Sequence, residues 1–123
     1  MASIKPESNG EILTIHICEL RLLDEMTIQQ VYKEILSVLE KTQEPNVLLH
    51  FGRVSFMSSS ALGMLIRLHK KCKEFKVGLK LSNISPNIRE VFKITGLEKI
   101  FEIYADASEA EEAFKKSQVF FRK

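Results

Sequence analysis

The sequence predicts one α/β domain in which about four helices pack against a mostly parallel sheet of about four to five strands. Three observations predict this architecture. The 123 residues suffice for one core, and their apolar content of 45% is ordinary for a globular protein. Apolar residues recur in turn at strand spacing and at helical spacing. The resulting order, in which each strand is followed by a helix, favours parallel strands joined by helices.

The first half of the chain predicts strand, helix and strand. Polar and apolar positions alternate over residues 10–18, which indicates a strand with one face more buried. Apolar residues then recur at helical spacing to about Lys41, and Thr27 with Gln30 three residues later forms a capping-box pattern at the helix start. Residues 46–51 are a short apolar run, typical of a strand covered on both faces.

The second half predicts helix, strand and helix. Helical spacing returns over residues 61–75, and residues 76–81 alternate again as a strand does. Both ends of the next helix are indicated by the residue types found there. Ser85 is placed as the N-cap, Pro86 as the first helical residue and Gly96 as the stop.

A last strand and a last helix complete the predicted domain. Residues 99–105 indicate the strand, and either Asp106 or Ser108 opens an acidic helix. These elements divide the chain into an N-terminal extension, the domain and a C-terminal tail, at residues 1–9, 10–116 and 117–123.

Composition argues against several classes of protein. No apolar run approaches the ~20 residues of a membrane span, and the first residues lack the apolar core of a signal peptide. We therefore expect a cytoplasmic protein without a membrane partner. Cys18 and Cys72 are expected to be buried free thiols, since each has apolar neighbours. His16, His50 and His69 lack metal-ligand spacing, so no metal or other cofactor is expected.

Positive charge is concentrated in residues 67–80. Six basic residues against one acidic residue give this segment +5, which leaves −3 for the rest of a chain whose net charge is +2. Interleaved aromatic residues and nucleic-acid recognition motifs are lacking, so we expect a solvated basic face rather than nucleic-acid binding. Such a face can steer an acidic partner.

Three consecutive serines, Ser58 to Ser60, stand where a strand runs into a helix, at the carboxyl edge of the predicted sheet. One serine would cap the helix, and the others would be small turn residues. Nucleophilic catalysis would need a G-x-S-x-G elbow or a nearby histidine, and phosphate cradling would need glycines and a lysine. A fourth interpretation is phosphorylation of a serine, which adds charge at an exposed helix start. The residues alone do not decide between capping and phosphorylation.

The serine run also resembles a family signature. The stretch V-S-F-M-S-S-S-A-L-G, residues 54–63, resembles the D-S-S-G-L signature of the STAS family, the domains of bacterial anti-sigma factor antagonists and sulfate-transporter tails. I-S-P-N-I-R-E-V-F at residues 84–92 and T-G-L-E-K-I-F at residues 95–101 resemble later segments of the same family. The resemblance covers roughly residues 11–114 and implies a STAS-type fold.

The resemblance implies a non-enzymatic interaction switch in a bacterial partner-switching pathway. In this family, an anti-sigma factor that is also a serine kinase phosphorylates the first serine of D-S-S-G, and a serine phosphatase reverses the reaction. Carried over by position, the acceptor is Ser59, its neighbour is Ser60 and the leucine is Leu62. Ser58 replaces the family's aspartate, and Ala61 replaces its glycine.

The predicted partner-binding surface combines the serine turn, the start of the helix that follows it, and the nearby loop of residues 85–87. It comprises Met57, Ser58, Ser60, Gly63, Ser85, Pro86 and Asn87. Gly63 is included because glycine inside a helix costs about 1 kcal/mol relative to alanine, which suggests close approach of another chain. Two alternatives remain. One is an unphosphorylated STAS scaffold or small-ligand-sensing module, and the other is a Ser-dependent hydrolase or phosphoryl carrier.

Overall fold

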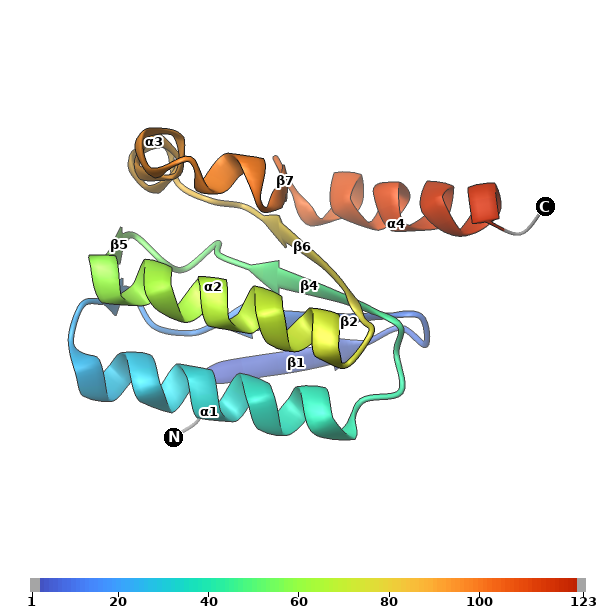
Figure 1. The fold of residues 1–123 in the computed structure, drawn as a ribbon, viewed down its shortest axis with the longest axis horizontal. Helices are drawn as coiled ribbons and strands as arrows, with labels where there is room; N and C mark the ends of the chain where they lie inside the picture. The colour runs from blue at the N-terminus through green and yellow to red at the C-terminus, as the bar shows by residue number, and fades with distance from the viewer. Residues whose placement is uncertain (1–2, 122–123) are drawn as a thin grey trace.

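The fold is that of a computed structural model, which describes the backbone of residues 3–121 and the side chains of residues 3–116. Five strands form the main sheet, and helices cover both of its faces (Figure 1). The sheet strands are β1 (Ile4–Ser8), β2 (Ile12–Ile17), β4 (Asn46–His50), β6 (Gly78–Ser82) and β7 (Glu102–Tyr104). The helices are α1 (Glu25–Lys41), α2 (Ser59–Glu74), α3 (Pro86–Thr95) and α4 (Ala107–Phe121), with a 3-10 turn, η1 (Leu97–Lys99), after α3. Two short strands, β3 (Arg21–Leu22) and β5 (Phe56–Met57), form a separate pair.

The sheet order is β1-β2-β4-β6-β7. The β2–β4, β4–β6 and β6–β7 pairs are parallel, which confirms the predicted mostly parallel sheet, whereas β1 is antiparallel to β2. Sequence patterns did not predict β1. Only Ile4 of its five residues is buried, and Pro6 lies within it, so the strand lacks a period-2 pattern. Proline is tolerated there because β1 is an edge strand.

Alternating side chains of the strands supply two unequal cores. Ile15, Leu49 and Leu81 belong to the large cluster that includes the buried faces of α1 and α2. Ile12 and Leu48 belong to a small cluster with Ala110 and Phe114 of α4. The first cluster lies on the face of the sheet that α1 and α2 cover, and the second lies on the face that α4 covers.

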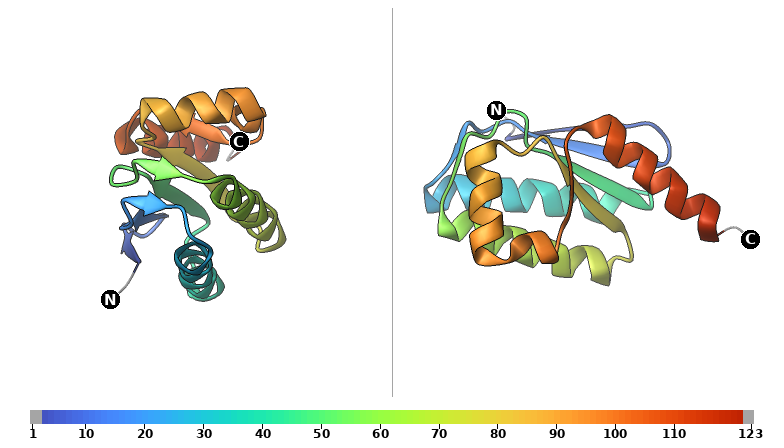
Figure 2. Two further views of the ribbon diagram at one scale, coloured as in Figure 1. Left: turned by 90° about the vertical axis from the view of Figure 1, so that its left-hand side faces the viewer. Right: turned by 90° about the horizontal axis from the view of Figure 1, so that it is seen from above.

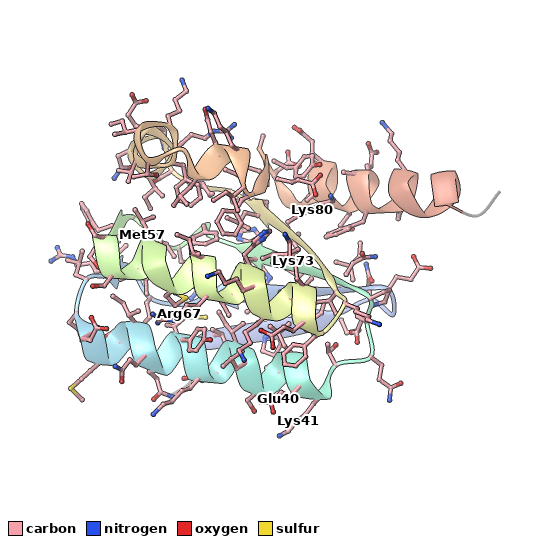
Figure 3. The ribbon with its side chains drawn as sticks, viewed as in Figure 1. Glu40, Lys41, Met57, Arg67, Lys73 and Lys80 are labelled. Atoms are coloured by element: carbon pink, nitrogen blue, oxygen red, sulfur yellow. The ribbon has the colours of Figure 1, made fainter. Side chains whose placement is uncertain are left out.

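One member of the predicted basic face is not solvated. Lys80 is 5% exposed, and its Nζ lies 3.0 Å from Oε2 of Glu102. The same Nζ lies 4.8 Å from the ring centre of Phe114, so Lys80 joins the sheet to α4 (Figure 3). The expectation of a solvated charge is therefore wrong at Lys80, where an ion pair and an aromatic ring compensate for burial.

Helix α1 begins earlier than the sequence pattern indicated. Its N-cap is Asp24, whose Oδ2 accepts from the Thr27 N–H at 2.9 Å and whose Oδ1 accepts from the Thr27 hydroxyl at 2.8 Å. These bonds hold the pKa of Asp24 below its ordinary value. The predicted capping box is wrong, because Gln30 donates to Glu34 instead. The predicted end at Lys41 is confirmed.

The boundaries near the C-terminus follow the expected signals. Pro86 is the first residue of α3, and Gly96 ends it with φ of 77°, a left-handed conformation that favours glycine. Asp106, one of two predicted choices, starts α4, since its Oδ1 accepts from the Glu109 N–H at 2.9 Å. Helix α4 continues to Phe121, past the predicted tail boundary.

Two predicted segments reach beyond what the structure covers. Residues 1–2 of the N-terminal extension and residues 122–123 of the tail lie outside the described residues. Within residues 3–121, none of the helices combines the length and the apolar character needed to cross a membrane.

Candidate functional site

The serine turn lies at the carboxyl end of the sheet, as predicted. After β4, the chain turns into β5 and enters α2 through Ser58. Strand β5 is held by β3, with Phe56 opposite Arg21 and Met57 opposite Leu22. The Ser58 N–H donates to the Leu22 carbonyl at 2.9 Å. Figure 2 (left) looks directly at this end, where β5 and β3 lie between α3 and the end-on view of α1.

The three serines have different environments. Ser58 is the half-buried N-cap of α2, and its Oγ accepts from the Ala61 N–H at 3.3 Å. Ser59 and Ser60 are the first two helical residues, and both are exposed. Their hydroxyls have no hydrogen-bond partner among the residues that the structure describes. Capping therefore needs only Ser58, and two hydroxyls face solvent at a helix start.

The start of α3 is tied to the serine turn. The Ser85 hydroxyl donates to Oδ1 of Asn87 at 2.8 Å and makes no capping bond to its helix. Nδ2 of Asn87 donates to the carbonyl of Ser55, just before β5, at 3.0 Å. Pro86 and Asn87 are exposed. The structure thus joins the two predicted loops at one end of the molecule.

An apolar collar surrounds the turn, and the sequence did not predict it. It consists of exposed apolar residues of the segments next to the turn: Leu20, Leu23, Met26, Phe56 and Val91. Three of these residues, Leu23, Phe56 and Val91, line a hollow of about 140 Å³ together with Met57, Leu62, Asn87 and Ile88. Met57 is labelled beside the start of α2 in Figure 3. Exposed apolar residues gathered at one site are typical of surfaces that bind other proteins.

Two further residues of α2, Ala61 and Gly63, differ in their surroundings. Ala61 is fully buried in the main core, so its methyl group points into the protein. Gly63 is half-buried, and a Cβ added there would meet no atom within 4 Å. The fold would therefore accept a larger residue than glycine at position 63. Close approach of a partner chain at Gly63 stays a prediction.

The other candidate groups lie apart from this surface. Burial, followed by the charge of Lys73, lowers the pKa of His69, whose ring packs against Phe101 with ring centres 5.3 Å apart. Burial raises the pKa of Cys72 to about 11, and this thiol is free and buried, as predicted. Cys18 is free but only half-buried. Among the described residues, no group of three His, Cys, Asp or Glu side chains could hold a metal ion.

A family comparison agrees with this geometry. A model of the STAS domain matches residues 3–110 of the chain. The chain belongs to the STAS domain family. This confirms the resemblance inferred from the serine run, and it brings β1 into the domain's matched region.

The relatives of this STAS domain match most of its length, and two solved structures share its fold. It is 29% identical over 98 residues to BtrV of Bordetella bronchiseptica, whose name describes an anti-sigma factor antagonist, over 80% of this chain and 84% of BtrV. An anti-sigma-factor antagonist STAS domain from Planctomyces limnophilus superposes with a TM-score of 0.78 at 28% identity, over 92% of this chain and 98% of that chain. The unphosphorylated Bacillus antagonist SpoIIAA superposes with a TM-score of 0.74 at 24% identity, over 92% and 96% of the two chains.

Proposed function

We propose that this STAS domain is an anti-sigma factor antagonist-like switch that binds an anti-sigma factor serine kinase and is controlled by reversible phosphorylation of Ser59. The observation that carries the proposal is the free, exposed hydroxyl of Ser59 beside an apolar collar. BtrV and SpoIIAA, which bear the name of antagonist, support the general role. SpoIIAA is also known in a phosphorylated form.

Ser59 is a better acceptor than either neighbour. Ser58 is half-buried and its hydroxyl already accepts from the Ala61 N–H, so it is less accessible to a kinase than the exposed Ser59. Ser60 is equally exposed, but the family signature places the acceptor one position earlier. Phosphorylation of Ser59 leaves the capping bond intact.

Phosphate on Ser59 would act on the partner rather than on the fold. The first N–H groups of a helix have no partner inside it and favour an anion by about 0.3–1 kcal/mol. The helix start therefore tolerates the −1.5 to −2 charges of a phosphoserine. A partner that covers the collar would have to desolvate those charges, which is costly without a matching cation. Docking is blocked while α2 remains folded.

The substitution of serine for the family's aspartate at position 58 is compatible with this proposal. Serine and aspartate are both strong N-caps, so the exchange preserves the helix start and removes one negative charge next to the acceptor. Burial of Ala61 means that the second substitution adds no methyl group to the partner-facing surface.

The test is incubation with a cognate anti-sigma factor kinase and ATP, followed by peptide mass spectrometry. Phosphate on Ser59, lost in Ser59→Ala and retained in the matched control Ser60→Ala, is the expected result. A cognate serine phosphatase should then remove it. Phosphate found only elsewhere, or still added to Ser59→Ala, would overturn the assignment. Ester hydrolysis that depends on Ser59 would favour the hydrolase alternative instead.

A further inference from the structure

His50 ends strand β4 and directly precedes the loop that leads to the serine turn. Its ring is half-buried, and the ring of His16 on β2 packs against it with ring centres 4.6 Å apart. Nδ1 of His50 accepts a hydrogen bond from the Gly52 N–H at 3.1 Å. The side chain therefore connects the sheet to the first residues of the loop.

This hydrogen bond favours the neutral form of His50. Nδ1 accepts a hydrogen bond only when it carries no proton, so the ring is the neutral tautomer with its hydrogen on Nε2. A proton added to Nδ1 would point at the Gly52 N–H and place two donors against each other. Protonation of Nδ1 therefore removes the hydrogen bond that ties Gly52 to His50.

Backbone hydrogen bonds connect the loop after His50 to the serine turn. Val54 N–H donates to the Phe51 carbonyl at 3.0 Å, which closes a turn around Gly52, and both of these apolar side chains are buried. Ser55 N–H donates to the Leu20 carbonyl at 2.9 Å, where β5 begins to pair with β3. Packing inside the turn is tight, since a Cβ at Gly52 would lie 2.6 Å from Cε1 of His50.

We propose that His50 is a pH-responsive positioning residue of the serine turn. Neutral His50 holds the Phe51–Val54 turn closed, and protonation releases Gly52 and loosens β5 and the start of α2. The consequence for partner binding rests on the proposed function, whereas the structural response of the turn does not.

Charged and titratable groups from neighbouring strands set the direction of the response. His16 on β2 adjoins His50, Oε1 of Glu7 on β1 lies 3.4 Å from Nε2 of His16, and Lys5 pairs with His16 in the β1–β2 register. The next strands place Ser82 and then Tyr104 in the same row. Burial, followed by the charge of His16, lowers the pKa of His50, and Glu7 opposes this. The closed turn is therefore fully held above the ordinary histidine pKa of 6.5 and weakens as the pH falls below it.

The test is a pH titration of the full, unphosphorylated chain by amide NMR, from about pH 7.5 to about pH 5. We expect the Gly52 and Ser58–Ser60 amides to shift with one common midpoint, equal to that of the His50 ring. In His50→Asn, whose Oδ1 can still accept from Gly52 but cannot take the proton, that transition should disappear. His69→Asn is the matched control, because His69 is also half-buried with a lowered pKa but packs against Phe101. That variant should keep the transition.

A second variant tests the same contact without acid. Gly52→Ala should displace the His50 ring at pH 7.5 and shift the serine-turn amides in the direction that acid shifts them in the natural chain. The proposal is overturned if the Ser58–Ser60 amides do not follow the His50 midpoint, or if they titrate unchanged in His50→Asn. Either result leaves the phosphorylation of Ser59 untouched, because no kinase takes part in the measurement.

Discussion

Helices α2 and α3 begin at the same end of the sheet, and each has a serine at its N-cap, but the two serines do different work. The Ser58 hydroxyl caps its own helix, because it accepts a hydrogen bond from the Ala61 N–H. Ser85 gives its hydroxyl to Asn87, which in turn holds the carbonyl of Ser55 across the gap between the loops. The start of α2 is thus capped by its own serine. The start of α3 instead acts as a brace, by which we mean that Ser85 and Asn87 connect it to the loop at Ser55. Residue type alone does not reveal which role a serine has, because the hydrogen-bond partner decides it.

The largest expected difference between the two helix starts is in stability. Ser58→Ala should lower the free energy of unfolding by about 1 kcal/mol, because the capping bond to Ala61 is lost. Ser85→Ala should change it by less than about 0.5 kcal/mol, since no capping bond exists there. Urea denaturation of both variants makes the measurement. Equal losses would show that the two serines are not distinct.

Ser58→Asp sharpens the same comparison. Aspartate caps a helix as well as serine does and adds a favourable charge at the helix start, so the free energy of unfolding should stay equal or rise by up to about 1 kcal/mol. A loss as large as that of Ser58→Ala would contradict the capping role of position 58.

Gly63 tests how far the partner-facing surface extends along α2. Gly63→Ala should raise the free energy of unfolding by about 0.5–1 kcal/mol, because alanine has the higher helix propensity and no atom obstructs its Cβ. Partner affinity should fall if another chain approaches closely at this position. Unchanged affinity in the stabilised variant, measured by calorimetry, would remove Gly63 from the surface.

Asn87 tests the brace. Asn87→Ala removes the bond to the Ser55 carbonyl at an exposed site, so the free energy of unfolding should fall by only about 0.5 kcal/mol. The informative readout is hydrogen exchange at Ser55 and Phe56, which should become faster than in Ser85→Ala. Equal exchange rates in the two variants would mean that Asn87 does not brace the loop.

Ser59 should show the smallest effect on stability. Its hydroxyl is exposed and has no partner among the described residues, so Ser59→Ala should change the free energy of unfolding by less than about 0.5 kcal/mol. Thermal or urea denaturation checks this. A loss similar to that of Ser58→Ala would assign Ser59 a structural role and weaken its claim to be a free acceptor.

Much of the fold was predictable because local signals and burial agree along most of the chain. Pro86 and Gly96 bounded α3 correctly, since each residue fits a single position of a helix end. The start of α1 was misplaced because Thr27 resembles a cap, whereas in the fold its N–H and hydroxyl donate to Asp24. Strand β1 escaped prediction because its exposed edge position imposes no alternation on the sequence.

The site was predictable in its polar part but not in its apolar part. The serine run and the loop of Ser85 stood out through spacing and resemblance. Leu23 and Phe56 did not stand out, because an apolar residue is normally expected to be buried, and only the folded structure shows that these two are exposed. The pairing of β3 with β5, which exposes Phe56 beside the turn, depends on residues distant in sequence and has no local signal.

The affinity of a purified anti-sigma factor kinase for this chain, with and without phosphate on Ser59, is the most direct test of the central claim. Isothermal titration calorimetry should give a Kd for the phosphorylated chain that is higher by at least about tenfold, or about 1.4 kcal/mol, with α2 folded in both forms. Equal affinities for the two forms would contradict the account, because phosphate on Ser59 would then not control binding.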